Sequence, residues 1–256
     1  MTVAGPQSVL ELREVRRAFG GVRAVDGVSL TVEAGEARAL IGPNGAGKTS
    51  LFNLVTGHLR PDGGTVLYQG RSLHGLAPHR IWRRGVARTF QVPALFPYLT
   101  ARENVQVALG SVAGRALSLR GSARRLGREE AEALLGRVGL EAAANQPGGT
   151  LAHGDQKKLE LAIVLAGSPG LLLLDEPTAG MAPADRQALM ALVGTIGRER
   201  GLTLLFTEHD MDVVFQVADR VTVLHQGRVI AEGPPAAIRA DPEVQRVYLG
   251  DLEGAA

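Results

Sequence analysis

The sequence of 256 residues contains no cysteine, and aromatic residues make up only 4% of it. The absence of cysteine excludes disulfides and thiolate metal sites, and it suits a reducing compartment such as the cytoplasm. Because aromatic rings are so few, we expect the core to pack mainly through Leu, Val, Ala and Ile. A chain of this length can hold one large domain and bury a sizeable core.

Long apolar runs and a large net charge are also missing. The apolar stretch at residues 161–174 is broken at residues 167–170 by Gly, Ser, Pro and Gly, so it does not reach the length of a membrane span. Residues 1–15 lack the basic region and apolar core of a secretory signal. The formal net charge is only +2, which argues against nucleic acid as a partner.

Arginine is nevertheless clustered in two segments, residues 80–88 and 115–128. Solvated helix faces or loops are the simplest interpretation of such clusters. The alternative is a surface that faces lipid headgroups or an acidic partner. The clusters comprise Arg80, Arg83, Arg84 and Arg88, and Arg115, Arg120, Arg124, Arg125 and Arg128.

Residues 42–49 read GPNGAGKT, a complete G-x-x-x-x-G-K-[ST] phosphate loop, and the residues just before it, 37–41, are apolar and strand-like. Such a loop offers backbone N–H groups to phosphates at the start of the next helix. Lys48 can reach the β- and γ-phosphates, and the Thr49 hydroxyl can ligate Mg²⁺. A glycine-rich turn without a ligand is the alternative. The expected nucleotide contacts are Gly42, Pro43, Asn44, Gly45, Ala46, Gly47, Lys48, Thr49 and Ser50.

Strand and helix signals predict an α/β fold with a mostly parallel sheet and a separate antiparallel β subdomain. Alternating apolar residues indicate antiparallel strands at 9–15 and 28–32, joined by a turn at 19–21, and another strand at 65–70. From residue 171, strands and helices alternate, which favours a parallel sheet covered on both faces. The expected strands are 171–174, 202–208 and 221–225, and the expected helices are 183–200, 212–218 and two short segments after Pro234.

Residues 98–145 are rich in Ala, Leu, Arg and Glu. They predict helices at 101–109 and 128–138 with an exposed, mobile loop at 110–127 between them. We therefore expect an inserted α-helical subdomain in a single domain. Its parts are a nucleotide-binding core at about 1–91 and 161–256, the helical subdomain at about 92–160 and a C-terminal helical tail at about 234–256.

Two carboxylates, Asp175 and Glu176, follow an apolar strand at its C-terminal end, where ligands bind in open α/β sheets. Asp175 is placed to hold Mg²⁺ through its water shell, and Glu176 to orient and polarise the attacking water. Capping of the next helix is the alternative. His209 follows a second strand and can contact the γ-phosphate, although a lone histidine is more often structural.

A series of motifs in this order, spread over nearly the whole chain, resembles the ATPase of an ATP-binding-cassette transporter: GPNGAGKT, Gln91, LAHGDQKKLELA, LLLLDEP, AGMAP and His209. The resemblance implies that Phe19 stacks on adenine and that Gln91 touches Mg²⁺ and senses the transmembrane partner. It implies a dimer of identical or different ATPases, because a signature segment caps the γ-phosphate of ATP on the second subunit. That segment corresponds to Leu151, Ala152, His153, Gly154 and Asp155.

Residues 86–105, 151–160 and 244–251 resemble, more narrowly, the ATPases of branched-chain amino acid importers and of related urea or amide importers. Lipid exporters share parts of these segments. The resemblance implies an ATPase at the cytoplasmic face of the inner or plasma membrane, working with permease subunits and an extracytoplasmic solute-binding protein. The competing class is a soluble cassette ATPase acting on the ribosome or nucleic acid. The apolar segment 92–99 either contacts the permease or packs in the core.

The sequence departs from the usual pattern of this family at three positions. Ala152 and Asp155 replace the serine and the last glutamine of the signature Leu-Ser-Gly-Gly-Gln. We therefore expect a lost hydroxyl contact and a carboxylate that can repel ATP, while the helix dipole remains. Ala182 stands where the family usually has Asp or Asn, which predicts a weaker link between the two half-sites.

Overall fold

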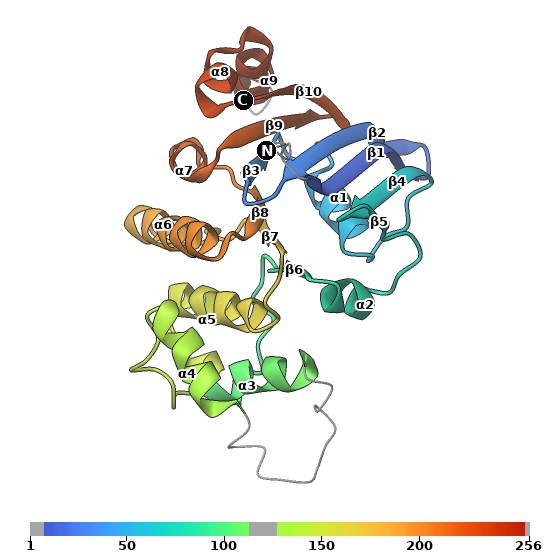
Figure 1. Ribbon diagram of the computed structural model, residues 1–256. Coiled ribbons are helices and arrows are strands. Elements are labelled where there is room, and N and C mark those ends of the chain that lie inside the picture. The colour runs from blue at the N-terminus through green and yellow to red at the C-terminus, as the bar shows by residue number, and fades with distance from the viewer. Residues whose placement is uncertain (1–7, 113–126, 254–256) are drawn as a thin grey trace, which may run out of the picture.

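The computed structural model describes residues 8–112 and 127–253 of the chain. Its strands form two sheets (Figure 1), one of four antiparallel strands and one of six strands in the order β10-β9-β3-β8-β7-β6. The predicted α/β class is confirmed. Helices lie on both sides of the six-stranded sheet, and a group of helices projects from its β6 end (Figure 1).

The antiparallel sheet is built on a long hairpin of β1, Ser8–Phe19, and β2, Val22–Glu33. Strands β4, Gly63–Tyr68, and β5, Arg71–Ser72, extend this sheet beyond β1. The hairpin turns at residues 20 and 21, as predicted, and its apolar positions face inward in cross-strand pairs such as Leu12 with Leu30. Both strands are longer than their apolar alternation predicted.

The six-stranded sheet carries the apolar strands expected from the sequence. Every residue of its central strands is buried: β3, Ala37–Ile41; β7, Leu171–Asp175; and β8, Thr203–Thr207. Strand β9, Arg220–His225, pairs in parallel with β3. Two edge strands were not predicted, β6, Val86–Arg88, and β10, Arg228–Gly233, which runs antiparallel to β9.

Successive residues of these buried strands pack into two different cores. Leu172 and Leu174 belong to a core on one face of the sheet, whereas Leu171 and Leu173 belong to a core on the other. The alternation follows from the period of two along a strand. Because both faces are covered, continuous apolar runs are favoured over alternating ones.

Nine α-helices lie within the described ranges. Helix α6 has the predicted bounds, since proline at N1 starts it and Gly201 ends it with a φ of 60°. Helix α2 was not predicted. The helices are α1, Lys48–Val55; α2, Pro78–Arg83; α3, Ala101–Val112; α4, Arg128–Arg137; α5, His153–Leu165; α6, Pro183–Arg200; α7, Met211–Val217; α8, Pro235–Ala240; and α9, Pro242–Glu253.

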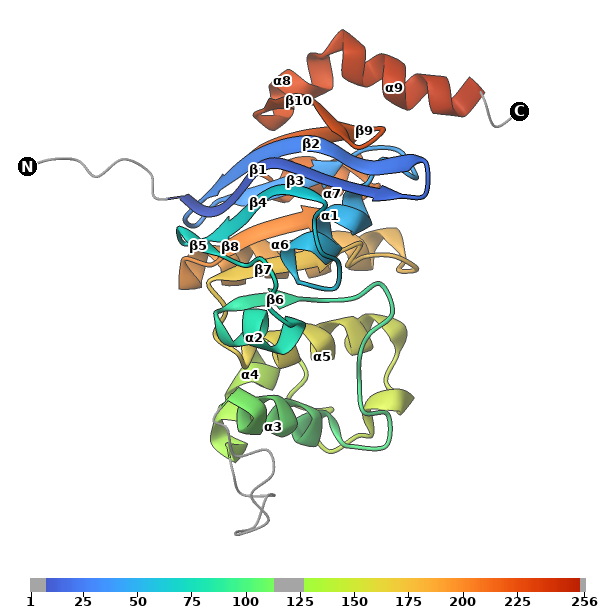
Figure 2. The same ribbon diagram turned by 90° about the vertical axis from the view of Figure 1, so that its right-hand side faces the viewer.

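Helices α3, α4 and α5 form the helical group below the sheets in Figure 1, and Figure 2 shows α9 at the opposite end of the molecule. Helix α3 continues to Val112, so residues 110–112 are helical and not part of the expected loop. Residues 113–126 of that loop lie outside the described residues. The expected subdomain boundary at residue 160 falls inside α5.

The segment 92–99 is partly packed and partly exposed. The Asn104 side-chain oxygen accepts a hydrogen bond from the Phe96 N–H at 2.8 Å, and the Asn104 side-chain nitrogen donates to the Phe96 carbonyl oxygen at 3.0 Å. Leu95 packs on the core, whereas Val92, Phe96 and Tyr98 are 79%, 53% and 94% exposed. Core packing therefore holds for Leu95, and contact with a permease stays a prediction for the exposed side chains.

The first arginine cluster is not one surface. Arg80, Arg83 and Arg84 are exposed, but Arg88 is buried in β6. The grouping of Arg88 with a solvated face was therefore wrong, because residues 84–86 turn the chain from helix α2 into the sheet. In the second cluster Arg128 is exposed, and the others lie outside the described residues. No helix in the described part of the chain is long and apolar enough to cross a membrane.

Candidate active site

The phosphate loop connects β3 to α1 and lies between β2 and the turn after β9. At Gly42, with φ of 153°, an added Cβ would come within 2.1 Å of the Leu224 carbonyl oxygen. At Gly47, with φ of 106°, it would come within 2.3 Å of the Ala24 carbonyl oxygen. Both positions therefore require glycine, for backbone conformation and for space. The loop leads into the N-terminus of α1, a position that favours an anion.

Lys48, the first residue of α1, folds back over this loop. Its ammonium group donates hydrogen bonds to the carbonyl oxygens of Gly42 at 2.5 Å and Pro43 at 3.0 Å. Burial lowers the pKa of Lys48 below its usual value, while the negative charges of Glu176 and Asp175 oppose that effect. The cation thus lies near both carboxylates that follow the Leu171–Leu174 run.

Asp175, the last residue of β7, is buried and bonded through both carboxylate oxygens. The Arg88 guanidinium lies 2.7 Å from Oδ2, and the Thr207 hydroxyl donates to Oδ1 at 3.0 Å. Arg88 is in turn fixed by the Asn53 side chain at 2.6 Å. The ion pair explains why an arginine is buried in β6. Neither Arg88 nor Thr207 was among the predicted site residues.

Glu176 forms one contact group with two other predicted site residues, Gln91 and His209. The Gln91 side-chain amide donates to Glu176 Oε2 at 2.9 Å, and His209 Nε2 lies 2.8 Å from Glu176 Oε1. Glu176 has a φ of 47°, and its N–H donates to the Thr207 hydroxyl at 3.0 Å. The left-handed backbone is unusual for a side chain of this size, and such strain occurs most often at functional sites.

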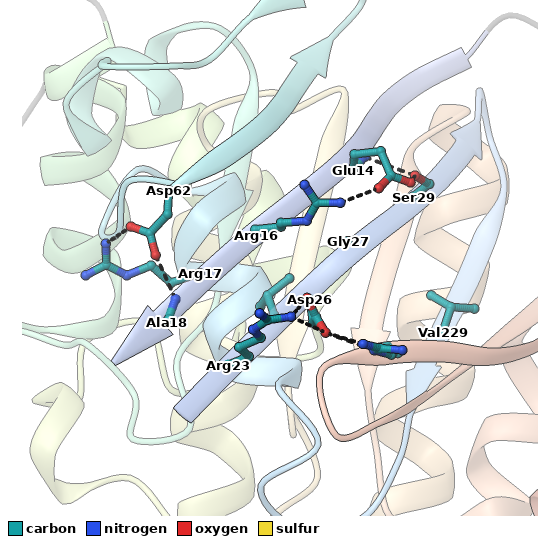
Figure 3. A pocket seen from close by; sticks show the side chains of 12 residues that line it. Glu14, Arg16, Arg17, Ala18, Arg23, Asp26, Gly27, Ser29, Asp62 and Val229 are labelled. Carbon is teal, nitrogen blue, oxygen red and sulfur yellow. Dashed lines mark hydrogen bonds and ion pairs between the residues drawn. The ribbon is translucent and has the colours of Figure 1, made fainter. Parts of the chain in front are cut away.

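Phe19 lies at the end of β1 with 45% of its surface exposed. The Arg17 guanidinium lies 4.9 Å from the Phe19 ring centroid, within range of a cation–π contact. Asp62 fixes Arg17 at 2.7 Å, and this pair is visible in Figure 3. The ring is therefore held from one side and is open to solvent over part of its surface.

A hollow of about 820 Å³ lies on the hairpin of β1 and β2, beside the start of β10. Figure 3 shows the side chains that line it. Asp26 lies within it, 2.6 Å from Arg228 and 3.3 Å from Arg23. The hydrogen bond from Arg228 holds the pKa of Asp26 below its usual value. The turn before Arg228 packs on the phosphate loop, where the Gly227 N–H donates to the Ala46 carbonyl at 2.9 Å. The ion pairs of the hollow therefore fix the hairpin beside that loop.

The signature residues lie at the start of α5, and their side chains form hydrogen bonds or ion pairs with Ala179 and Lys158 instead of the Glu176 carboxylate. Leu151 is buried, and Ala152 is the N-cap residue but makes no side-chain capping bond. His153 Nε2 lies 3.1 Å from the Ala179 carbonyl oxygen, and Asp155 pairs with Lys158 at 3.0 Å. Gly154 approaches Met181, since an added Cβ would lie 3.3 Å from its terminal methyl carbon. Asp155 lies in the first turn of α5, after the N-cap position that Ala152 occupies.

Comparison with known proteins agrees with this arrangement. The profile of the ABC transporter family matches residues 25–179, and that of the branched-chain amino acid ATP-binding cassette transporter matches residues 228–253. The chain is 41% identical over 250 residues to the high-affinity branched-chain amino acid transport ATP-binding protein BraF of Pseudomonas aeruginosa, covering 95% of this chain and 98% of BraF. It is also 41% identical to LivG of Escherichia coli over 254 residues, with coverage of 96% and 99%.

The same holds for a solved structure. The ADP conformation of MJ1267, an ATP-binding cassette of an ABC transporter, superposes with a TM-score of 0.84 at 29% identity, covering 95% of this chain and 99% of MJ1267. The fold, the phosphate loop and the full-length similarity lead to one conclusion. The chain belongs to the ABC transporter family and is one of its ATP-binding, ATP-hydrolysing cassettes.

Proposed function

We propose that this cassette powers a membrane importer for branched-chain amino acids. The observation that carries the proposal is the match of residues 228–253 to the branched-chain amino acid cassette profile, together with full-length similarity to BraF and LivG. In the structure this C-terminal segment comprises β10, α8 and α9. It lies at the end of the molecule opposite the helical group (Figure 2).

ATP binding is assigned to the phosphate loop, residues 42–50, and to Phe19. The loop backbone offers N–H groups to the phosphates, and Lys48 offers a cation that now holds two loop carbonyls. Arg17 covers one face of the Phe19 ring, and adenine is assigned to the other face. A stacked ring pair contributes about 0.5–1.5 kcal/mol beyond its area burial.

Mg²⁺ is assigned to the Thr49 hydroxyl, Gln91 and Asp175. Oxygen donors with a single carboxylate fit this ion, which keeps several waters and takes its remaining ligands from substrate phosphates. Both oxygens of Asp175 already accept bonds from Arg88 and Thr207, which fits contact through the water shell of the ion. When bound, Mg²⁺ neutralises charge that develops on the phosphates.

Glu176 is assigned the role of orienting and polarising the water that attacks the γ-phosphate. Its carboxylate is held between Gln91 and His209, and these two contacts restrict rotation of the Glu176 side chain. Lys48 and His209 lie where they can stabilise negative charge on the γ-phosphate. These contacts support the catalytic assignment of Glu176, His209 and Lys48.

A second cassette completes each site in this proposal. Residues 151–155 present the N-terminus of α5, a position that favours phosphate through exposed N–H groups and the helix dipole. Their side chains bond Ala179 and Lys158 and not the Glu176 carboxylate, so their nucleotide partner is assigned to another subunit. Lys158 offsets the Asp155 charge, which reduces the repulsion that Asp155 would exert.

We assign the exposed apolar side chains of Val92, Phe96 and Tyr98 to the contact with permease subunits. Exposed aromatic residues next to Gln91 offer a contact surface that Asn104 holds in shape. The cassette would then lie at the cytoplasmic face of the membrane, with an extracytoplasmic binding protein delivering the solute.

The test is solute uptake by the assembled complex. Co-purified cassette and permease subunits in proteoliposomes, with the binding protein added, should accumulate radiolabelled leucine only when ATP is inside. The Lys48→Ala complex should not accumulate leucine. Uptake of urea or an amide in place of leucine, isoleucine and valine would overturn the solute assignment. RNA binding without membrane association would overturn the importer proposal.

A further inference from the structure

Helix α5 holds the segment around Gln91 through two charged side chains that are almost fully buried. The Lys157 ammonium donates to the carbonyl oxygens of Gln91 at 2.6 Å and Phe90 at 3.3 Å. Glu160, three residues further along α5, accepts from the N–H groups of Phe90 at 2.9 Å and Ala94 at 3.4 Å. Helix α5 therefore binds the carbonyl oxygens of this segment through Lys157 and its N–H groups through Glu160.

Burying this pair is energetically unfavourable unless the bonds it makes are needed. Lys157 and Glu160 are only 4% and 3% exposed. Burial lowers the pKa of Lys157 and raises the pKa of Glu160 relative to their usual values. Apolar residues of similar volume would often pack as well or better at such positions. The burial of Lys157 and Glu160 is thus better explained by the backbone segment that they hold than by a contribution to the stability of the fold.

The segment it holds leads directly to Glu176. Gln91 receives the Lys157 bond on its backbone carbonyl and donates its side-chain amide to Glu176 at 2.9 Å. Lys157 also lies in the field of Glu208, Asp175 and Glu176, whose charges oppose the effect of burial on its pKa. No other lysine on α5 has this position, since Lys158 pairs with Asp155 near the helix surface.

We propose that Lys157 and Glu160 are positioning residues, which fix the backbone of residues 90–94 so that the Gln91 side chain is held against Glu176. The inference rests on the proposed function of Glu176 in hydrolysis. Neither residue touches nucleotide in this proposal. Their effect on turnover passes through Gln91, which distinguishes them from residues that only stabilise the fold.

The primary test measures ATP turnover and nucleotide affinity of the purified full chain. Lys157→Met should lower kcat about 10-fold or more and change the affinity for a fluorescent ATP analogue less than about 2-fold, because only the positioning of Gln91 is lost. Lys157→Arg, which keeps the cation and its donors, should retain most of the turnover. Glu160→Gln weakens the bonds to the Phe90 and Ala94 N–H groups and should also lower kcat. Glu199→Gln, an exposed change on α6, is its matched control and should leave kcat unchanged.

A double-mutant cycle separates positioning from stability. In the Gln91→Ala background, Lys157→Met should cause little further loss, since residues that act through one another are not additive. An equal loss in both backgrounds overturns the inference. If Gln91→Ala lowers kcat but Lys157→Met does not, only this inference is wrong. If Gln91→Ala itself has no effect, the proposed role of Gln91 fails and the inference fails with it.

A second measurement covers variants that fold poorly. The double variant Lys157→Met/Glu160→Leu removes both buried charges at once, so neither charge is left buried without the opposing one. We expect it to fold, to remain low in kcat and to show faster hydrogen exchange in residues 90–94 than the wild type. Recovery of kcat together with stability would show a structural role only and would overturn the proposal.

Discussion

At the residue scale, changes at Lys48 and Glu176 should separate ATP binding from ATP hydrolysis. Lys48→Ala removes the cation of the phosphate loop and should weaken ATP binding. Glu176→Gln keeps the shape and the contacts to Gln91 and His209, so it should bind ATP normally and lose ~10²-fold or more in hydrolysis. Nucleotide titration and steady-state turnover measure the two effects. Near-normal turnover in Glu176→Gln would contradict the assignment.

Phe19 provides a second prediction at this scale. Because 45% of the residue is exposed, its loss should affect stability little. Phe19→Ala should raise the apparent ATP constant about 5-fold, which corresponds to roughly 1 kcal/mol of ring stacking, with little change in maximal rate. Val22→Ala, an exposed change across the same turn, is the control. If ATP binding is unchanged and only the melting temperature falls, Phe19 acts as a packing residue.

At the element scale, helices α5 and α6 both begin at an alanine, which cannot cap a helix through its side chain. Ala152 and Ala182 are the N-cap residues of α5 and α6, and neither makes a capping bond. In α7, by contrast, the Asp210 side chain accepts from the N–H groups of Asp212 and Val213. Ala182→Asp should therefore stabilise the fold by ~0.5–2 kcal/mol, and Asp210→Ala should destabilise it by a similar amount. Urea unfolding measures both changes, and unchanged stability in Ala182→Asp would contradict the capping argument.

Asp155 lies in the first turn of α5, where its charge suits the helix dipole but faces the proposed site of another subunit. If Asp155 repels the γ-phosphate, Asp155→Gln should tighten ATP-driven dimerisation and raise turnover about 2- to 5-fold. The measurement requires the assembled complex, with the permease and the natural partner cassette. A fall in turnover would show that the Asp155–Lys158 pair at 3.0 Å supports the signature.

At the scale of the whole molecule, nucleotide binding should stabilise the fold. The phosphate loop touches β2, β3, α1 and the turn after β9, so a bound nucleotide bridges elements from both ends of the chain. At an ATP concentration about 100 times its dissociation constant, the free energy of unfolding should rise by ~2.7 kcal/mol. Calorimetry of Glu176→Gln, with Lys48→Ala as control, measures this shift. A shift of equal size in Lys48→Ala would contradict the assigned site.

Much of the fold could be predicted because local patterns specify it. Strands β3, β7 and β8 are continuous apolar runs, and α6 begins at proline and ends at glycine. Strand β6 and helix α2 were missed because three and six residues are too few to show a period. The extension of α3 to Val112 was missed because Gly110 and Ser111 resemble a loop locally.

The sequence by itself determined the phosphate loop, the two carboxylates at the end of the β7 segment and the membership of the family, because each depends on residues that are close together in the chain. Only the tertiary structure decided the partners of those residues. Arg88 meets Asp175 across 87 positions and Lys157 meets Gln91 across 66. A charged residue looks the same in sequence whether it faces solvent or a buried partner. The packing of α5 and β6 against β7 settles which of these occurs, because a charge removed from water must find its partner there.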